Sequence, residues 1–249
     1  MIAVKDLVKR YGTFTAVDGV SLDVAPGEIH GFLGPNGAGK TTTIRMIAGL
    51  LKPTEGTVVI NGHDLAAAPE QAKASLGFIP DRPFIYEKLT AGEFLRFHGG
   101  LYGMDEADAA RRGDEMLEVF ELTRWKDELV ESFSHGMKQR LVMSAAFLHR
   151  PQAVLVDEPM VGLDPRGARL IKDVFRSMSR RGVAILMSTH TLEVAQEMCD
   201  RIAIILKGKI IARGTVDELL ALAGGEDEQL TPVFLKLTGG TALQEIDEV

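Results

Sequence analysis

One eight-residue segment constrains this chain more than any other feature of its sequence. Residues 34–41 read Gly-Pro-Asn-Gly-Ala-Gly-Lys-Thr and match the pattern G-x-x-x-x-G-K-[ST] at every fixed position. The segment follows the apolar run Ile29–Leu33 and precedes a stretch in which Ile44 and Ile47 have helical spacing. Glycines let a backbone approach phosphate oxygens closely, and a helix N-terminus attracts anions. The segment therefore predicts a nucleotide-phosphate site.

Individual residues of this loop have separate expected roles. Lys40 supplies a cation for the β- and γ-phosphates, and the Thr41 hydroxyl is a Mg²⁺ ligand. Thr42 stands where a dinucleotide-binding G-x-G-x-x-G loop has its third glycine, which excludes that alternative. The residues expected to bind the nucleotide here are Gly34, Pro35, Asn36, Gly37, Ala38, Gly39, Lys40, Thr41 and Thr42.

Acidic residues follow a second apolar strand. Asp157 and Glu158 come directly after the run Ala153–Val156. In a parallel sheet that end of the strand faces the ligand crevice, so we expect Asp157 to hold Mg²⁺ and Glu158 to polarise the attacking water. His190 follows the apolar run Val183–Met187 and is expected to reach the same crevice, at the γ-phosphate.

Apolar runs alternate with helix-length segments along the chain, which is typical of βαβ units and a parallel sheet. The N-terminal part instead alternates apolar and polar residues, which is typical of a small antiparallel sheet. The predicted parallel strands are Ile29–Leu33, Ser75–Ile79, Ala153–Val156, Val183–Met187 and Ile202–Leu206. The predicted antiparallel strands are Val4–Tyr11, Ser21–Val24 and Thr57–Ile60.

The stretch from about 90 to 150 has no strand pattern and predicts helices instead. Thr90 and Glu93 have the spacing of a capping box at the start of the first helix. A second helix is expected over Ala107–Phe120, and a third over Ser134–Arg150, where Pro151 stops it. We therefore predict a helical insertion inside an α/β domain.

Composition narrows the functional classes. With 28 Lys and Arg against 35 Asp and Glu, the net charge is −7, so we expect no nucleic-acid partner. The single cysteine, Cys199, cannot form an intramolecular disulfide, which is typical of a reducing compartment. No apolar run approaches the ~18 residues of a membrane span. We therefore expect any membrane-spanning partner to be a separate polypeptide.

Taken together, these motifs resemble the nucleotide-binding subunit of ABC transporters along nearly the whole chain. Residues 134–140, Ser-His-Gly-Met-Lys-Gln-Arg, resemble the family signature, and residues 162–164, Gly-Leu-Asp, match its D-loop. His190 matches the switch histidine, and Tyr11 resembles the aromatic residue that stacks on adenine. Residues 231–239 resemble the ending of bacterial exporter subunits of the drug-resistance type.

The resemblance implies a fold and a division of the chain. The fold is of the α/β class: a P-loop NTPase (RecA-like) parallel-sheet core with an N-terminal antiparallel β subdomain and an inserted α-helical subdomain. The ATPase domain is expected over residues 1–222, with the core in 1–89 and 150–222 and the helical subdomain in 90–149. Residues 223–249 are expected to form a C-terminal tail.

The resemblance also implies a reaction, with ATP and Mg²⁺ as the bound groups. Its expected catalytic residues are Glu158, His190, Lys40 and Asp164. The signature residues are expected to cap a γ-phosphate held by the phosphate loop of another subunit, so that ATP joins a homodimer or a heterodimer. Those signature residues are Ser134, His135, Gly136 and Met137.

Three residues depart from the family pattern. His135 and Met137 replace the usual glycine and glutamine of the signature. Asp81 stands after the strand Ser75–Ile79, where the family has the glutamine of its Q-loop. Because a carboxylate can also reach Mg²⁺, we expect Asp81 to be a metal ligand beside Thr41 and Asp157.

Residues 82–86, Arg-Pro-Phe-Ile-Tyr, form an apolar loop. Such a loop either tucks onto the core or marks a partner site. The resemblance favours the second, with a transmembrane permease subunit docking near Phe84 and Tyr86. We therefore expect a motor subunit that is cytoplasmic, peripheral on the inner face of the cell membrane, and part of an exporter.

Other ATPases share the nucleotide motifs. Chromosome and repair ATPases place long coiled coils between the phosphate loop and the signature, whereas this insertion is short and lacks sustained heptads. A cytosolic assembly ATPase of the iron–sulfur scaffold type stays open as an alternative, because only its partner separates it from a transporter subunit. A GTPase is not favoured, because the chain has no NKxD motif.

Overall fold

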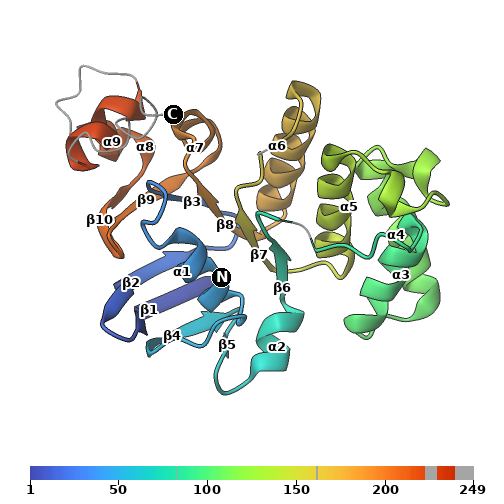
Figure 1. The fold of residues 1–249 in the computed structure, drawn as a ribbon, viewed down its shortest axis with the longest axis horizontal. Helices are drawn as coiled ribbons and strands as arrows, with labels where there is room; N and C mark the ends of the chain where they lie inside the picture. Colours follow the sequence, from blue (N-terminus) through green and yellow to red (C-terminus); the bar gives the residue numbers. More distant parts are fainter. Residues whose placement is uncertain (83, 161, 222–228, 239–249) are drawn as a thin grey trace.

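The computed structural model describes residues 1–82, 84–160, 162–221 and 229–238, and it contains two sheets (Figure 1). The six-stranded sheet has the order β10 (Lys209–Gly214), β9 (Arg201–Leu206), β3 (Ile29–Leu33), β8 (Ala184–Thr189), β7 (Ala153–Asp157) and β6 (Leu76–Ile79). The four-stranded antiparallel sheet has the order β2 (Phe14–Val24), β1 (Ile2–Tyr11), β4 (Glu55–Ile60) and β5 (His63–Asp64). Both predicted sheets are therefore present.

The larger sheet is parallel from β9 to β6, and β10 runs antiparallel to β9 at its edge. Leu33 of β3 pairs with Thr189 of β8, and Asp157 of β7 pairs with Ser188 of β8. The three central strands therefore end level with one another, at the edge where parallel strands present their ligand site.

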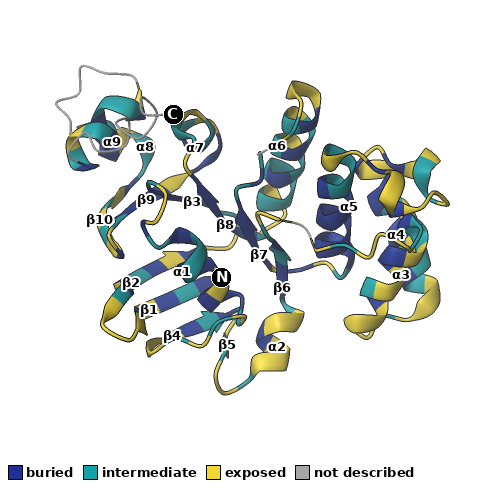
Figure 2. Ribbon diagram, viewed as in Figure 1, coloured by how far each residue is buried: buried dark blue, intermediate teal, exposed yellow. Residues whose placement is uncertain are grey.

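The central strands are buried on both faces. In β7, Val154 and Val156 belong to one core cluster, whereas Ala153 and Leu155 belong to another. Because successive side chains of a strand point to opposite faces, each strand contributes to both cores. Helix α1 (Lys40–Ile47) and the antiparallel sheet complete the second cluster, and the dark blue of the central strands in Figure 2 shows this burial.

Helices α3 (Ala91–Leu101), α4 (Glu106–Val119) and α5 (His135–Leu148) lie together beyond the β6 edge of the sheet, at the right of Figure 1. Two short 3₁₀ turns, Thr123–Trp125 and Val130–Ser132, join α4 to α5. These elements fall within the helical insertion predicted over 90–149, and the three long helices match the three expected ones.

Helix starts in this insertion follow the chain's own capping residues. Thr90 and Glu93 make a reciprocal capping box at α3, as predicted. The Asp105 side chain accepts from the N–H groups of Ala107 and Asp108 at the start of α4. Such caps satisfy backbone donors that have no partner inside the helix, so they fix where each helix begins.

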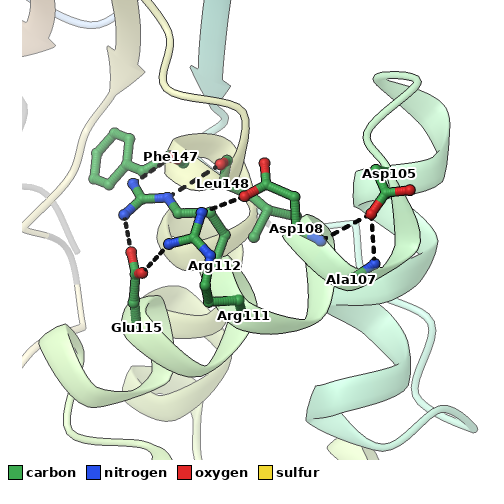
Figure 3. A network of polar contacts seen from close by, with 8 residues as sticks. All are labelled: Asp105, Ala107, Asp108, Arg111, Arg112, Glu115, Phe147 and Leu148. Carbon is green, nitrogen blue, oxygen red and sulfur yellow. Dashed lines mark hydrogen bonds and ion pairs between the residues drawn. The ribbon is translucent and has the colours of Figure 1, made fainter.

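Arg112 ties α4 to the end of α5 (Figure 3). Its guanidinium donates to the carbonyls of Phe147 and Leu148 and pairs with Glu115. A cation at a helix C-terminus satisfies carbonyls that lack intrahelical donors and interacts favourably with the helix dipole. The insertion is thereby held as one unit at the end of α5 opposite its signature residues.

In the described part of the chain, five further helices lie outside the helical insertion, in addition to α1. They are α2 (Pro69–Ala74), α6 (Pro165–Arg180), α7 (Leu192–Met198), α8 (Val216–Ala221) and α9 (Leu230–Thr238). Helix α9 lies in the region expected as a C-terminal tail, and its Leu230, Val233 and Phe234 are buried. Residues 222–228 and 239–249 lie outside the described residues. Within the described ranges, no helix combines the length and apolar character needed to cross a membrane.

A glycine sets the approach of the signature helix α5 to the sheet. A Cβ added at Gly77 in β6 would lie 2.7 Å from the Ala146 carbonyl oxygen in α5 and 3.1 Å from the Pro151 ring. The Ala146 oxygen belongs to the backbone, and the Pro151 ring is closed onto its own backbone nitrogen, so neither neighbour can turn aside. A larger side chain at this position therefore pushes α5 away from the strand that leads to Asp81.

We predict that Gly77→Ala destabilises the fold by about 1–3 kcal/mol, the usual cost of overpacking. Gly100→Ala in α3 is the control, because its added Cβ meets nothing within 4 Å and the substitution replaces a glycine inside a helix. Urea unfolding of both variants checks this. Equal stability of Gly77→Ala and the wild-type chain would contradict the close approach.

His149 is the C-cap residue of α5, and its side chain is half-buried. Its ring stacks on Tyr102 at 3.6 Å between centroids, its Nε2 lies 3.2 Å from the Leu76 carbonyl oxygen, and its Nδ1 has no hydrogen-bond partner among the described residues. Burial lowers the pKa of His149 from 6.5 to about 4, partly opposed by the hydrogen bond to Leu76. The folded chain therefore holds this imidazole neutral.

Because the pKa of His149 is lower in the folded chain, its contribution to stability is present above pH 6.5 and is lost as the pH falls toward 4. We predict that His149→Phe, which keeps a stacking ring, makes the free energy of unfolding less sensitive to pH across that window. Denaturant unfolding at several pH values checks this, with His63→Phe as control. An unchanged pH dependence in His149→Phe would contradict it.

Candidate active site: a phosphate cradle at the carboxyl edge of the sheet

The loop between β3 and α1 needs glycine at three positions for two reasons. A Cβ at Gly34 would lie 2.4 Å from the Ile205 carbonyl oxygen, and one at Gly39 would lie 2.7 Å from that of Ala16. Gly37 faces open space, but its φ of +74° favours glycine. The loop is thus packed closely against β9 and β2 on one side and open on the other.

Helix α1 begins without a side-chain cap, because its N-cap residue is Gly39 in the left-handed conformation. The Gly39 carbonyl accepts at 2.9 Å from the Thr43 N–H, which leaves the N–H groups of the first turn without an intrahelical acceptor. Uncapped donors and the positive end of the helix dipole together make an anion site.

Lys40 lies within this site and is 7% exposed. Its Nζ donates to the Gly34 carbonyl at 2.6 Å and to the Pro35 carbonyl at 3.2 Å. Burial lowers the pKa of Lys40, and the carboxylates of Glu158 and Asp157 partly oppose that shift. The ammonium group is therefore held inside the loop, where an anionic ligand would stabilise its charged form.

Asp157 lies at the end of β7 and is 2% exposed. Burial raises the pKa of its carboxyl, the hydroxyls of Ser188 and Thr41 oppose the shift by hydrogen bonding, and the charges of Asp81 and Glu158 add to it. The structure thus brings the three expected metal ligands, Thr41, Asp157 and Asp81, to one place. Among the described residues, however, no three His, Cys, Asp or Glu side chains are placed to hold a metal ion by themselves.

Glu158 and His190 contact each other. The Glu158 Oε1 lies 2.8 Å from the His190 Nδ1, and Glu158 adopts a φ of +52°, which is uncommon for a residue with a side chain. The Glu158 N–H donates to the Ser188 carbonyl at 3.2 Å and anchors that backbone to β8. The turn places the carboxylate against His190, which follows β8.

Most of these residues line one cleft of about 500 Å³, whereas Gly34 and Asp157 lie outside its lining. Its lining contains the expected residues of the phosphate loop from Pro35 to Thr42, together with Tyr11, Asp81, Glu158 and His190. It also contains Phe14 and Ala16 of β2, which sequence reasoning missed. Phe14 is 64% exposed and lies beyond the Gly12 turn, opposite Tyr11 in the hairpin. The signal that the sequence offered was a second aromatic residue only three positions after Tyr11, the residue expected to stack on adenine.

The signature residues lie elsewhere in the chain's own fold. Ser134 is the N-cap of α5, where its hydroxyl accepts from the Met137 N–H at 3.3 Å. Ser134, His135, Gly136 and Met137 are absent from the lining of the phosphate cleft. Asp164 is also absent from it and caps α6 by accepting from the Gly167 N–H at 2.8 Å. A role for these residues at a nucleotide therefore requires a second subunit.

The loop after Asp81 has an apolar exposed surface and a buried anchor. Phe84 is 88% exposed, and Tyr86 is 50% exposed and meets the ring of Phe97 edge to face at 5.2 Å. Ile85 between them packs against the core. Residue 83 of this loop lies outside the described residues. The loop therefore presents two aromatic side chains beside α3 while its middle is fixed.

Comparison with known proteins shows which family the chain belongs to. The model of the ABC transporter family matches residues 17–161, from β2 through the carboxylates of β7. The chain belongs to the ABC transporter family. It is an ATP-binding and ATP-hydrolysing subunit of such a transporter, and the matches do not favour the assembly or repair ATPases.

One curated relative is the linearmycin resistance ATP-binding protein LnrL of Bacillus subtilis, 38% identical over 226 residues that cover 91% of this chain and 73% of the relative. A solved ATP-binding subunit of an ABC transporter has a TM-score of 0.89 at 36% identity and covers 95% and 99% of the two chains. A dimeric ATP-binding cassette in a post-hydrolysis state, bound to ADP and Pi, has a TM-score of 0.79 at 25% identity and covers 86% and 98%.

We predict that Tyr11→Ala and Phe14→Ala of this ABC subunit each weaken ATP binding by about 1–3 kcal/mol, the range for loss of one base-stacking ring. A dissociation constant from titration with a fluorescent ATP analogue checks this. Phe84→Ala is the control, because it removes an exposed aromatic ring outside the cleft. Unchanged affinity in both cleft variants would mean that the base binds elsewhere.

Proposed function

We propose that this chain is the motor subunit of an ABC exporter, which pairs around two Mg²⁺-ATP and drives a separate transmembrane permease. The observation that carries the proposal is the meeting of Lys40, Asp157, Glu158 and His190 at the uncapped start of α1. Export is supported by the relative named for linearmycin resistance. The cargo of this chain is left open by that name.

The triphosphate would bind at the first turn of α1. The free N–H groups of the loop and helix would hold phosphate oxygens, and Lys40 would exchange its contacts with the Gly34 and Pro35 carbonyls for contacts with phosphate. This exchange replaces neutral acceptors by charged ones, which strengthens each hydrogen bond. The same groups would then bind the triphosphate before the reaction and neutralise the negative charge that develops on it during the reaction.

The residues near Thr41 fit a Mg²⁺ ion that arrives with the nucleotide. Asp157 is buried beside the charges of Asp81 and Glu158, and this clustering of carboxylates is relieved by a divalent cation. Mg²⁺ in nucleotide sites commonly takes one or two carboxylates and completes its shell with phosphate oxygens and water. Thr41 and Asp157 would hold it, with Asp81 nearby, and when bound it would neutralise charge on the phosphates.

Glu158 would orient and deprotonate the attacking water. Its contact with His190 would hold the carboxylate at the cleft, and the His190 side chain, 52% exposed, lines the same cleft, where the γ-phosphate would lie. The reaction then needs positioning and charge neutralisation more than covalent chemistry from the protein.

A second subunit would complete each site. The N-terminus of α5, with Ser134 and the three residues after it, presents free N–H groups that would meet the γ-phosphate held by the partner's loop. Subunits of this family dimerise, and the dimeric cassette bound to ADP and Pi has the same fold. The partner would be a second copy of this chain or a different ATPase subunit.

The permease would dock beside α3. Phe84 and Tyr86 are exposed aromatic residues on a loop that begins at the cleft residue Asp81, and Tyr86 contacts the exposed ring of Phe97 in α3. Exposed apolar groups of this kind mark partner surfaces. The chain would then sit on the cytoplasmic face of the membrane, held there by its permease.

We predict that Glu158→Gln binds ATP with near wild-type affinity and hydrolyses it about 10²–10⁴-fold more slowly, because an amide cannot act as a general base. That loss corresponds to roughly 3–5 kcal/mol of activation free energy. Phosphate release under saturating Mg²⁺-ATP measures it, and a fluorescent ATP analogue measures binding. Glu131→Gln, an exposed carboxyl near α5, is the control. Hydrolysis at the wild-type rate in Glu158→Gln would remove the proposed mechanism.

A further inference from the structure

His135, which replaces the usual glycine of the signature, lies against Gly162 of the D-loop. A Cβ built on Gly162 would lie 2.6 Å from the Cδ2 and 2.8 Å from the Nε2 of His135. One edge of the imidazole therefore rests against the Gly162 Cα, while the residue as a whole is exposed. The side chain that replaces the usual signature glycine is thus engaged within its own subunit.

Gly162 is suited to this contact in two independent ways. Its φ is +76°, a conformation that side chains rarely adopt, and its missing Cβ makes room for the ring. The next D-loop residue, Leu163, lies between two helix starts. Its Cδ2 would be 3.7 Å from a Cβ on Gly136 of α5 and 3.8 Å from one on Gly167 of α6.

These contacts join two sites that the proposed mechanism assigns to different nucleotides. Glu158 lines the chain's own cleft and is followed in sequence by the D-loop residues Gly162–Asp164, whereas the tip of α5 would meet the nucleotide of the partner. His135 and Leu163 are where the D-loop and the helix tip touch. Glu158, four residues before Gly162, holds an uncommon φ of +52°, a conformation that persists only where the surrounding contacts fix it.

We propose that His135 is a positioning residue: its ring, packed on Gly162, sets the D-loop against the signature helix and thereby aligns Glu158 with the partner's contribution to the site. This inference rests on the proposed function. The ring acts through packing on Gly162, so its shape matters and its ability to donate a proton does not.

The first test separates packing from direct phosphate contact. His135→Ala removes the ring and is expected to lower kcat about tenfold, within the range by which contacting residues couple, while the KM for ATP stays within about twofold. His135→Phe keeps a flat ring edge without a polar nitrogen and is expected to recover most of the kcat that His135→Ala loses. Loss of activity in His135→Phe equal to that in His135→Ala would overturn the proposal in favour of a polar contact.

The second test is a double-mutant cycle with Gly162. Gly162→Ala introduces both a strained φ and a clash with the ring, whereas in the His135→Gly background only the strain remains. The fall in kcat caused by Gly162→Ala is therefore expected to be about tenfold smaller in that background. Gly182→Ala has a φ of +89° with nothing near its Cβ, so its effect is expected to be the same in both backgrounds.

Failure of this inference is distinguishable from failure of the proposed function. If Glu158→Gln still hydrolyses ATP at the wild-type rate, the mechanism itself is wrong. If Glu158→Gln is inactive but His135→Ala keeps the wild-type kcat, only the positioning role is wrong. An equal effect of Gly162→Ala in both backgrounds would also overturn it. Thermal melting and binding of a fluorescent ATP analogue confirm that each variant is folded.

Discussion

The site depends on parallel strands that end level with one another. Leu33 pairs with Thr189, and Ser188 pairs with Asp157, so β3, β8 and β7 stop at the same edge. The glycine loop after β3, the carboxylates of β7 and the histidine after β8 therefore meet in space. A shift of one residue in either pairing would turn every side chain of that strand to the opposite face. The burial of both faces opposes such a shift, so the two hydrophobic cores hold the catalytic register.

Charged side chains gather at the same edge, and the protein's own groups only partly stabilise their charged forms. Burial lowers the pKa of Lys40 and raises that of Asp157, although the two groups have opposite charges. A site that disfavours the charged form of both its cation and its anion is suited to ligands that carry charge, namely phosphate for Lys40 and a metal ion for Asp157. This arrangement trades stability of the empty chain for binding, as functional sites often do.

Much of this could be predicted from sequence because the signals are local. The loop at 34–41, the buried runs of β3 and β7, and the capping box at Thr90 each carry their own physical reason. The edge strand β10 and the helix α9 were missed, since their stability comes from packing onto a sheet edge and a core that the sequence does not display. Phe14 was missed because its role arises from the hairpin that places it opposite Tyr11. The contact of His135 with Gly162 joins residues that are distant in sequence, and no pattern in either segment announces it.

The central claim is that ATP is held between the phosphate loop of one chain and the α5 tip of another. Light scattering on Glu158→Gln measures this most directly, because slow hydrolysis preserves the bound triphosphate. We expect the mass of two chains with Mg²⁺-ATP and of one chain with Mg²⁺-ADP, and a return to one chain in ATP when a Ser134→Arg substitution blocks the helix tip. A single-chain mass for Glu158→Gln saturated with Mg²⁺-ATP would contradict it.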